Sequence, residues 1–291
     1  MIEFKDKVAV ITGSASGMGR AVAERCAQEG MKVVLADIEQ KALDRAESEM
    51  KAAGATVLAV RTDVSKPEAL DALARRTMDT FGAVHLLHNN AGVSAGNAVW
   101  ETTLRDWQWA MGVNLWGVIH GIRAFLPIML RQDTECHIIN TASMGGLMST
   151  PFIGATYNVS KWGIVAISET LFHEMALMGT KIGVSVLCPG YVNTRIVDPE
   201  RNRPAEMLND PAWEEKRQAA SHVQTVKQLG TEWCATGMEP REVADIVLNA
   251  IKEGTFYIYT HPEFMMASEQ RTMELLQDIP PQSMFNAMIF G

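Results

Sequence analysis

Paired cysteines, paired histidines and basic runs are missing from this sequence of 291 residues. The four cysteines lie far apart and form no CxxC pair, so the sequence indicates neither a zinc knuckle nor a disulfide framework. We expect them to be reduced, buried and structural. No two of the seven histidines form an HExxH-type ligand pair, so no metal site is predicted. A net charge of −8 without a cluster of Lys or Arg makes DNA and RNA poor partners.

Uninterrupted apolar runs are short. Stretches such as Val8–Ile11 and Ile182–Leu187 fall far below the ~20 residues that span a bilayer, so no membrane segment is predicted. Residues 1–10 lead directly into an apolar predicted strand. They lack the basic region, the apolar helix and the small-residue cleavage site that make up a secretory signal peptide. We therefore expect a cytoplasmic protein. A chain of this length with 47% hydrophobic residues can bury a large core as one domain, residues 1–291.

Seven apolar runs of strand length alternate with longer segments of helical period. The runs are rich in Val, Ile and Leu without polar alternation, which is typical of strands covered on both faces, so the sheet should be mostly parallel. The sequence therefore predicts an α/β fold, a Rossmann-type doubly wound parallel sheet of about seven strands, with ligands bound at the strand carboxyl ends. The predicted strands are Lys7–Thr12, Lys32–Ala36, Thr56–Val60, Val84–Asn89, His137–Thr141, Ile182–Cys188 and Phe256–Tyr259.

Two segments depart from this alternation. Residues 195–238 are polar and rich in proline, follow a strand carboxyl end and precede a predicted helix over Pro240–Glu253, so they are predicted to form a helical flap over the site. Residues 261–291 form a methionine-rich C-terminal extension, for which helix packing or subunit contact is the favoured interpretation.

The first predicted strand leads into a glycine-rich turn that opens directly into a helix. Glycines let the backbone approach a pyrophosphate, whose charge is stabilised by free N–H groups and the dipole at the helix N-terminus. An ordinary tight turn would explain this motif if it stood alone, but further motifs accompany it. The predicted phosphate-binding residues are Gly13, Ser14, Ser16, Gly17, Met18 and Gly19.

Asp37 closes the second predicted strand, at the position where a carboxylate accepts hydrogen bonds from an adenosine ribose. Such a carboxylate repels a 2′-phosphate. Ile38 follows it, and Ser16 rather than a basic residue lies in the glycine turn, so nothing adjacent would neutralise that phosphate. We therefore predict NAD rather than NADP, with Asp37 and Ile38 at the cofactor. Asp37 could also be the N-cap of a helix starting at Glu39, and the two interpretations are compatible.

Residues after three more strands complete the predicted cofactor site. Asp63 and Val64 follow the third strand and are expected at the adenine edge. Each residue alone could be a cap or a turn, but a dinucleotide lies along successive strand ends. Thr194 is expected at the nicotinamide carboxamide. The remaining predicted contacts are Asn90, Ala91 and Gly92 after the fourth strand, and Pro189, Gly190, Val192 and Thr194 after the sixth.

Tyr157 and Lys161 stand at i and i+4 on one predicted helical face. A phenol has an ordinary pKa of about 10, and an adjacent cation lowers this pKa by favouring the phenolate, so the pair is predicted to carry acid/base chemistry. Lys161 is also expected to bind the nicotinamide ribose. Ser143 would donate a hydrogen bond to the substrate oxygen. Asn114, inside a predicted helix over Leu104–Leu130, would hold a water that connects Lys161 to solvent.

An apolar pocket is predicted where the flap meets the nicotinamide. It indicates a bulky or aromatic secondary alcohol or ketone as the small-molecule substrate, with Ser143 and Tyr157 at its oxygen. Filling of the core is the competing interpretation for the methionines. The residues expected to face this pocket are Met144, Met148, Phe152, Tyr191, Met207 and Trp213.

Taken together, these motifs resemble the short-chain dehydrogenase/reductase family over about residues 5–260. TGSASGMG is similar to its TGxxxGxG, NNAG to its NNAG and PGYVNT to its PG motif, while Asn114, Ser143, Tyr157 and Lys161 match its catalytic tetrad. The resemblance implies hydride transfer at nicotinamide C4 and proton transfer by the tyrosine. It also implies a homodimer or homotetramer whose contacts fall on the helices over 104–130 and 155–179.

Short motifs in the C-terminal third, such as Asn202-Arg203-Pro204 and Tyr257-Ile258-Tyr259, also resemble the Cα-dehydrogenases of lignin-type aryl ethers. Two other functions stay open on this fold. A non-catalytic NAD(H)-binding regulator would not need Ser143 and Tyr157, and isomerases or dehydratases usually carry TGxxGxxG, unlike the three-residue gap between Gly13 and Gly17.

Overall fold

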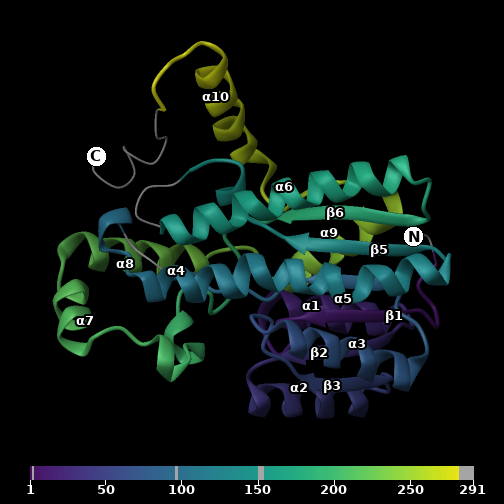
Figure 1. The fold of residues 1–291 in the computed structure, drawn as a ribbon. Coiled ribbons are helices and arrows are strands. Elements are labelled where there is room, and N and C mark those ends of the chain that lie inside the picture. The colour runs from purple at the N-terminus through teal and green to yellow at the C-terminus, as the bar shows by residue number, and fades with distance from the viewer. Residues whose placement is uncertain (2, 96–97, 150–153, 282–291) are drawn as a thin grey trace.

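The computed structural model describes residues 1, 3–95, 98–149 and 154–281. They form a seven-stranded sheet between two layers of helices (Figure 1). Neighbouring strands pair in parallel in the order β3-β2-β1-β4-β5-β6-β7. The predicted Rossmann-type doubly wound sheet is confirmed, and its strands are β1 (Val8–Thr12), β2 (Lys32–Asp37), β3 (Val57–Arg61), β4 (Leu86–Asn89), β5 (Cys136–Thr141), β6 (Ile182–Cys188) and β7 (Tyr257–Tyr259).

Both faces of the sheet are buried, which explains the uninterrupted apolar runs. Side chains alternate between the faces of a strand. In β1, Ala9 and Ile11 therefore join one core and Val8 and Val10 the other. The first core is covered by α1 (Gly17–Gln28), α2 (Gln40–Ala52) and α9 (Pro240–Glu253), and the second by α3 (Pro67–Phe81), α5 (Gly117–Gln132) and α6 (Ala155–Leu177).

The predicted helix over 104–130 is interrupted. It consists of α4 (Leu104–Met111), a π-helical turn η2 (Gly112–Trp116) and α5. Single π turns inside α-helices insert an extra residue and are frequent at functional sites. Asn114 lies in this turn and is fully buried. The helical period of the sequence gave no sign of the interruption.

The continuous segment Leu104–Gln132 is long and apolar enough to cross a membrane by length and composition, since an 18-residue window within it has a mean hydropathy of 1.4. Polar residues are dispersed along this segment, so the search for uninterrupted apolar runs in the sequence did not find it. The segment packs against α3 and α6, and its buried His120 bonds Val64 O through Nδ1 at 3.1 Å. It is thus part of the helical layer that covers the sheet.

The predicted flap is helical and lies beyond the carboxyl ends of the strands, the side to which the β5 and β6 arrows point in Figure 1. Its two ends are joined, because Asn193 N donates to Met238 O at 2.9 Å and Met238 N donates to Tyr191 O at 3.0 Å. Its helices are η4 (Pro199–Asn202), η5 (Ala205–Met207), α7 (Pro211–Gln218) and α8 (Ser221–Ala235).

The C-terminal extension begins with η6 (Pro262–Phe264) and α10 (Met265–Leu276), a helix that projects from the body (Figure 1). Its first turn packs on the protein, where Met265 joins a cluster with Met144 and Met148. The Arg271 guanidinium lies 4.2 Å from the Trp162 ring centre. All four cysteines are free and buried, as predicted.

Candidate active site

A cavity of about 850 Å³ opens at the carboxyl ends of the strands. It reaches from Asp37, at the end of β2, to Trp233 on α8 of the flap. Most of the sequence-predicted site residues line it, although they come from seven separate parts of the chain. Among the predicted cofactor-binding and catalytic residues, Ser14, Gly19 and Asn114 do not line it.

The glycine turn forms the phosphate-binding end of this cavity. Gly13 and Gly17 have φ values of +64° and +56°, a region in which glycine is favoured. The Ser16 side chain makes no capping hydrogen bond at the start of α1, so the helix N-terminus remains available to an anion. A Cβ on Gly17 would lie 3.1 Å from Thr194 Cγ2, which places the turn directly opposite the PGYVNT segment. This cradle fits the pyrophosphate of a dinucleotide.

Ser14 and Gly19 support the turn from behind. Ser14 is fully buried and its hydroxyl accepts a hydrogen bond from Ala36 N at 2.9 Å, so it ties the turn to β2 instead of facing a ligand. Gly19 is also buried, and a Cβ there would lie 2.3 Å from Gly13 O. Neither residue lines the cavity, so close packing explains both in this structure, and their direct contact with the cofactor stays a prediction.

Asp37 lines the cavity and is hydrogen-bonded to the glycine turn. Its Oδ2 accepts a hydrogen bond from Ala15 N at 2.9 Å, and its Oδ1 accepts one from Glu39 N at 3.0 Å. Burial raises the pKa of Asp37, while the hydrogen bonds from Glu39 and Ala15 oppose that rise. The helix α2 begins at Gln40 with Glu39 as its N-cap, so the alternative in which Asp37 caps a helix from Glu39 is wrong.

The residues after β3 and β4 form the floor of the cofactor end. Asp63, predicted at the adenine edge, lines the cavity but also accepts two hydrogen bonds from Ser65, at 3.0 Å from its N–H and 2.7 Å from its hydroxyl. The Asn90 amide donates to Thr12 O at 2.9 Å and thereby holds the β4 loop against the glycine turn. A Cβ on Gly92 would lie 3.6 Å from Lys161 Nζ.

Tyr157, Lys161 and Ser143 meet at the chemical end. Tyr157 and Lys161 lie on α6, and Lys161 Nζ is 5.4 Å from the centre of the Tyr157 ring. Lys161 Nζ donates a hydrogen bond to Thr141 O, the last residue of β5, at 2.8 Å. The Ser143 side chain is hydrogen-bonded to Tyr157 and also accepts from Gly145 N at 3.1 Å. A partly buried phenol, a hydroxyl and a buried amine thus line one wall of the cavity.

Burial has opposite effects on the two titratable groups of this wall. It raises the pKa of Tyr157, and the hydrogen bond to Ser143 partly opposes the rise. It lowers the pKa of Lys161 to about 8. In this structure the pKa of Tyr157 therefore lies above its ordinary value, opposite to the direction expected from a neighbouring cation, because desolvation is the largest effect on the phenol.

Asn114 binds protein groups with both polar atoms of its side chain. Its Oδ1 accepts from Val93 N at 2.8 Å, and its Nδ2 donates to Val93 O at 3.0 Å and to Ser160 Oγ at 3.1 Å. It does not line the cavity, and its predicted role of holding a water that connects Lys161 to solvent stays a prediction. The π turn aims Asn114 at the β4 loop, where it fixes the backbone beside Gly92 and Lys161.

The substrate end of the cavity is mainly apolar. Met144, Met148 and Tyr191 line it as predicted, whereas Met207 and Trp213 do not. Met207 instead packs beside Trp109. Phe152 lies outside the described residues. Sequence reasoning missed several large lining side chains. Trp109 and Trp233 lie on helices with no strand end to locate them, while Phe264 lies in η6, just after β7.

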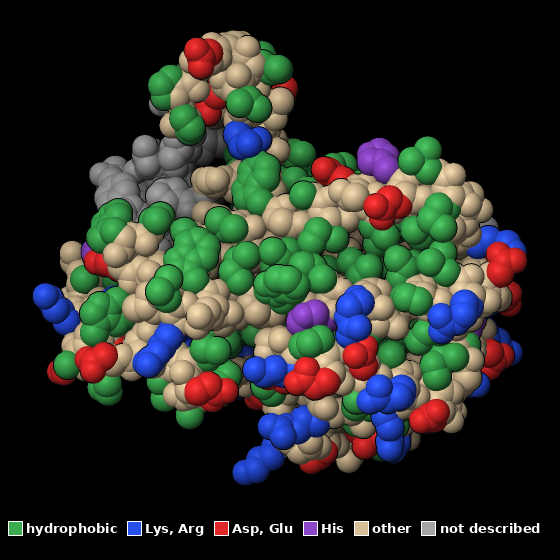
Figure 2. All heavy atoms as spheres, in the orientation of Figure 1, with side chains coloured by type: hydrophobic (Ala, Val, Ile, Leu, Met, Phe, Trp, Pro, Cys, Tyr) green, Lys and Arg blue, Asp and Glu red, His purple; other side chains and the backbone are tan. Residues whose placement is uncertain are grey.

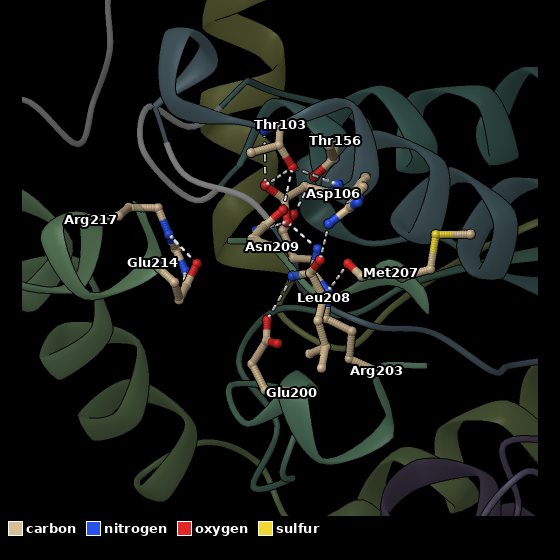
Figure 3. A network of polar contacts seen from close by, with 12 residues as sticks. Thr103, Asp106, Thr156, Glu200, Arg203, Met207, Leu208, Asn209, Glu214 and Arg217 are labelled. Carbon is tan, nitrogen blue, oxygen red and sulfur yellow. Dashed lines mark hydrogen bonds and ion pairs between the residues drawn. The ribbon is translucent and has the colours of Figure 1, made fainter. Parts of the chain in front are cut away.

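The flap is anchored to α4 by a buried ion pair (Figure 3). Arg203 Nη2 donates to Asp106 Oδ1 at 2.6 Å, and their side chains are only 2% and 4% exposed. Asn209 Nδ2 donates to the same oxygen at 3.0 Å, while Asp106 Oδ2 accepts from Thr103 N at 2.9 Å. The Arg203 guanidinium also lies 4.9 Å from the Trp109 ring centre. The network therefore holds both the flap and one wall of the cavity.

Comparison with known proteins agrees with this geometry. The family model described as short chain dehydrogenase matches residues 7–205. The chain is 35% identical to a "CLA biosynthesis dehydrogenase/reductase" of Lactiplantibacillus plantarum, with 97% of each chain covered, and 30% identical to a "C alpha-dehydrogenase" of Sphingobium, covering 97% of this chain and 89% of that one.

A solved structure of a short-chain dehydrogenase/reductase from Burkholderia phymatum in complex with NAD is 44% identical and superposes with a TM-score of 0.93, covering 97% of this chain and 99% of that one. The cradle for a dinucleotide, the Tyr157–Lys161 pair and these similarities have one explanation: the chain belongs to the short-chain dehydrogenase family of oxidoreductases.

Proposed function

We propose that this chain is an NAD-dependent dehydrogenase or ketone reductase that interconverts a bulky or aromatic secondary alcohol and its ketone. The observation that carries the proposal is the meeting of Tyr157, Ser143 and Lys161 on one wall of a cavity whose other end is a glycine cradle. A regulator that only bound NAD(H) would not need a partly buried phenol hydrogen-bonded to a serine beside its ligand.

NAD would lie along the strand ends, from Asp37 to Thr194, and supply the acceptor for the hydride that leaves the carbinol carbon. Tyr157 takes the hydroxyl proton of the alcohol during oxidation and returns a proton to the carbonyl oxygen during reduction. Ser143 donates a hydrogen bond to the same oxygen and stabilises its developing negative charge. Lys161 holds the ribose hydroxyls, and its ammonium form favours the Tyr157 phenolate.

The direction of the pKa shift at Tyr157 bears on the direction of catalysis. Since burial raises the pKa of the phenol, Tyr157 is protonated at neutral pH and ready to act as an acid toward a ketone. Alcohol oxidation needs the phenolate and therefore accelerates as the pH rises. Ketone reduction needs the phenol and slows over the same range.

Shape and lining support a substrate with an extended apolar part. Met144 and Met148 lie beside the reacting wall, while Tyr191, Trp233 and Phe264 enclose the region under the flap. The Tyr191 and Trp233 rings are in contact, with their centres 4.9 Å apart and their planes tilted by 44°. Aromatic walls of this kind bind aryl or long alkyl groups better than sugars or small polyols.

The test is to mix purified protein with NAD or NADP and a panel of secondary alcohols, benzylic and long-chain alkyl ones included, and to follow reduced nicotinamide by its absorbance. We expect NADH to form with the intact protein and turnover to fall by roughly a thousandfold or more in Tyr157→Phe, as for loss of a general acid/base. NADH binding should survive the substitution. Equal turnover by Tyr157→Phe would overturn the mechanism, and turnover of sugars alone would overturn the substrate class.

We also propose that the enzyme works in the cytoplasm as a homodimer or homotetramer. Figure 2 shows hydrophobic side chains gathered over the face formed by α4, α5 and α6. Trp116, Val159 and Phe172 are 52%, 47% and 39% exposed there. An exposed apolar surface of this kind is typical of subunit contacts. Light scattering should give a multiple of the 32.0 kDa chain, and Trp116→Asp should reduce it.

A further inference from the structure

Glu39 connects the adenosine end of the cofactor site to the flap. It follows Asp37 by two residues, and its N–H donates to Asp37 Oδ1 at 3.0 Å. Its carboxylate turns toward the flap, where Oε1 accepts from Arg201 Nε at 3.1 Å and from Asn202 Nδ2 at 2.9 Å. Oε2 lies 3.7 Å from Arg195 Nη2. One carboxylate thus receives two guanidiniums from a segment more than 150 residues away.

Both arginines lie where an adenosine substituent would meet them. Arg195 and Arg201 line the same cavity as Asp37 and Ile38. The flap holds them in place, because the neighbouring Arg203 is bound to Asp106 and almost completely buried. The adenosine end of the site therefore contains two basic side chains that its local sequence, Asp37-Ile38-Glu39, does not reveal.

Glu39 faces Arg195 and Arg201 in its ionised form. Burial acts to raise the pKa of Glu39, but the hydrogen bonds and charges from Asn202, Arg201 and Arg195 together hold it below its usual value, so Glu39 is ionised at neutral pH. Other charged side chains lie nearby, because Asp63, Asp198 and Glu200 also line the cavity and Arg61 Nε donates to Ile38 O at 3.3 Å. Glu39 is nevertheless the carboxylate that pairs with both guanidiniums, so its loss removes the ion pairs of Arg195 and Arg201.

We infer that Glu39 is a second determinant of the preference for NAD over NADP, because it binds the two guanidiniums that would otherwise pair with a 2′-phosphate. The inference rests on the proposed function. Arginine pairs with phosphate through charge-assisted, often bidentate hydrogen bonds, and these are stronger than its bonds to a ribose hydroxyl. Asp37 repels the phosphate directly, whereas Glu39 acts by holding Arg195 and Arg201 away from it.

Glu39→Gln isolates this effect. The glutamine keeps a carbonyl oxygen for Asn202 and the size of the side chain, but removes the charge that binds the arginines. Dissociation constants of NADH and NADPH, measured by fluorescence titration without any alcohol substrate, give the selectivity directly. ADP and 2′,5′-ADP measure the same preference on fragments that lack the nicotinamide.

We expect Glu39→Gln to tighten NADPH and 2′,5′-ADP by roughly tenfold, while NADH and ADP change less than about threefold. The affinity for NADPH should increase less in Asp37→Ser alone than in the double variant Asp37→Ser with Glu39→Gln. Adding Arg201→Gln and Arg195→Gln to Glu39→Gln should abolish the gain, and melting temperatures will show that each variant is folded.

An unchanged NADPH-to-NADH ratio in folded Glu39→Gln would overturn the inference, as would a gain that persists without both arginines. Failure of the proposed function would look different, because the unaltered protein would then either bind neither dinucleotide or bind NADH without reducing NAD in the presence of any alcohol.

Discussion

Lys161 Nζ lies 5.4 Å from the centre of the Tyr157 ring and donates a hydrogen bond to Thr141 O at 2.8 Å. Lys161 is 3% exposed. The amine is therefore held between the end of β5 and the phenol, in a place where its charge is poorly solvated. Burial strengthens the effect of a neighbouring charge on Tyr157 and Lys161. It also destabilises the charged form of each, the Tyr157 phenolate and the Lys161 ammonium.

The pH dependence of alcohol oxidation should move when Ser143 is replaced. The hydrogen bond from Ser143 lowers the pKa of Tyr157 against the opposing effect of burial. In Ser143→Ala, that pKa rises further, so the ascending limb of kcat/KM against pH shifts to higher pH and the rate at neutral pH falls by about 10²-fold or more. The profile of kcat/KM between pH 6 and 10 measures the shift. A lower rate without a shift of the ascending limb of kcat/KM against pH would contradict the hydrogen bond between Ser143 and Tyr157.

Lys161→Met should abolish activity and stabilise the fold near neutral pH. Burial lowers the pKa of Lys161 to about 8, whereas an unfolded lysine titrates near its ordinary value of about 10.4. Between these two pH values the unfolded state binds more protons than the folded state, so the free energy of unfolding increases as the pH rises. Below about pH 8, Lys161 is charged in both states, and burying its charge destabilises the fold by the full amount.

Urea unfolding at several pH values tests this. We expect the free energy of unfolding of Lys161→Met to exceed that of the parent protein by roughly 1–3 kcal/mol near pH 7, after the loss of the hydrogen bond to Thr141 is counted. Near pH 10 the difference should be smaller. A variant that is equally destabilised at every pH would show that the buried amine carries no such cost.

The sheet and the chemical wall could be predicted from the sequence because their signals are local. Uninterrupted apolar runs located the strands, and the spacing of Tyr157 and Lys161 placed both on one face of α6. Parallel strands then bring their carboxyl ends to one edge, so Ser143 and the glycine turn line the same cavity although more than 120 residues separate them.

Other parts of the site depend on pairings that leave no local pattern. Arg203 and Asp106 are 97 residues apart, and neither the period nor the composition of their segments indicates a buried pair. The same holds for Glu39 with Arg201. The π turn at Asn114 was hidden for another reason, because one inserted residue hardly alters the apolar period of a helix that continues on both sides.

Breaking the ion pair of the flap should weaken both stability and substrate binding. Arg203→Met leaves the Asp106 carboxylate buried without its cation, which typically costs about 3–5 kcal/mol. The flap should then be cut faster by a protease, and KM for the alcohol should rise more than kcat falls. Replacement of both residues by apolar ones gives the coupling energy in a double-mutant cycle. Additive effects would show that the two side chains act independently.

Gly19→Ala should weaken NADH binding although Gly19 does not line the cavity. An added Cβ would lie 2.3 Å from Gly13 O and 2.5 Å from Asn90 Nδ2, so the glycine turn must move away from α1 to admit it. A shift of that size separates the backbone of Gly13 from the pyrophosphate that it is shaped to hold. We expect a loss of roughly tenfold or more in NADH affinity, accompanied by a lower melting temperature.

Gly54→Ala provides the matched control, because Gly54 also has no side chain but lies in open space, with no atom within 4 Å of an added Cβ. Its φ of +85° makes alanine unfavourable there, so this variant should lose stability by about 1 kcal/mol and keep its NADH affinity. Affinity that falls equally in both variants would attribute the effect to general destabilisation. A selective loss in Gly19→Ala would show that the contact between α1 and the glycine turn sets the shape of the cofactor cradle.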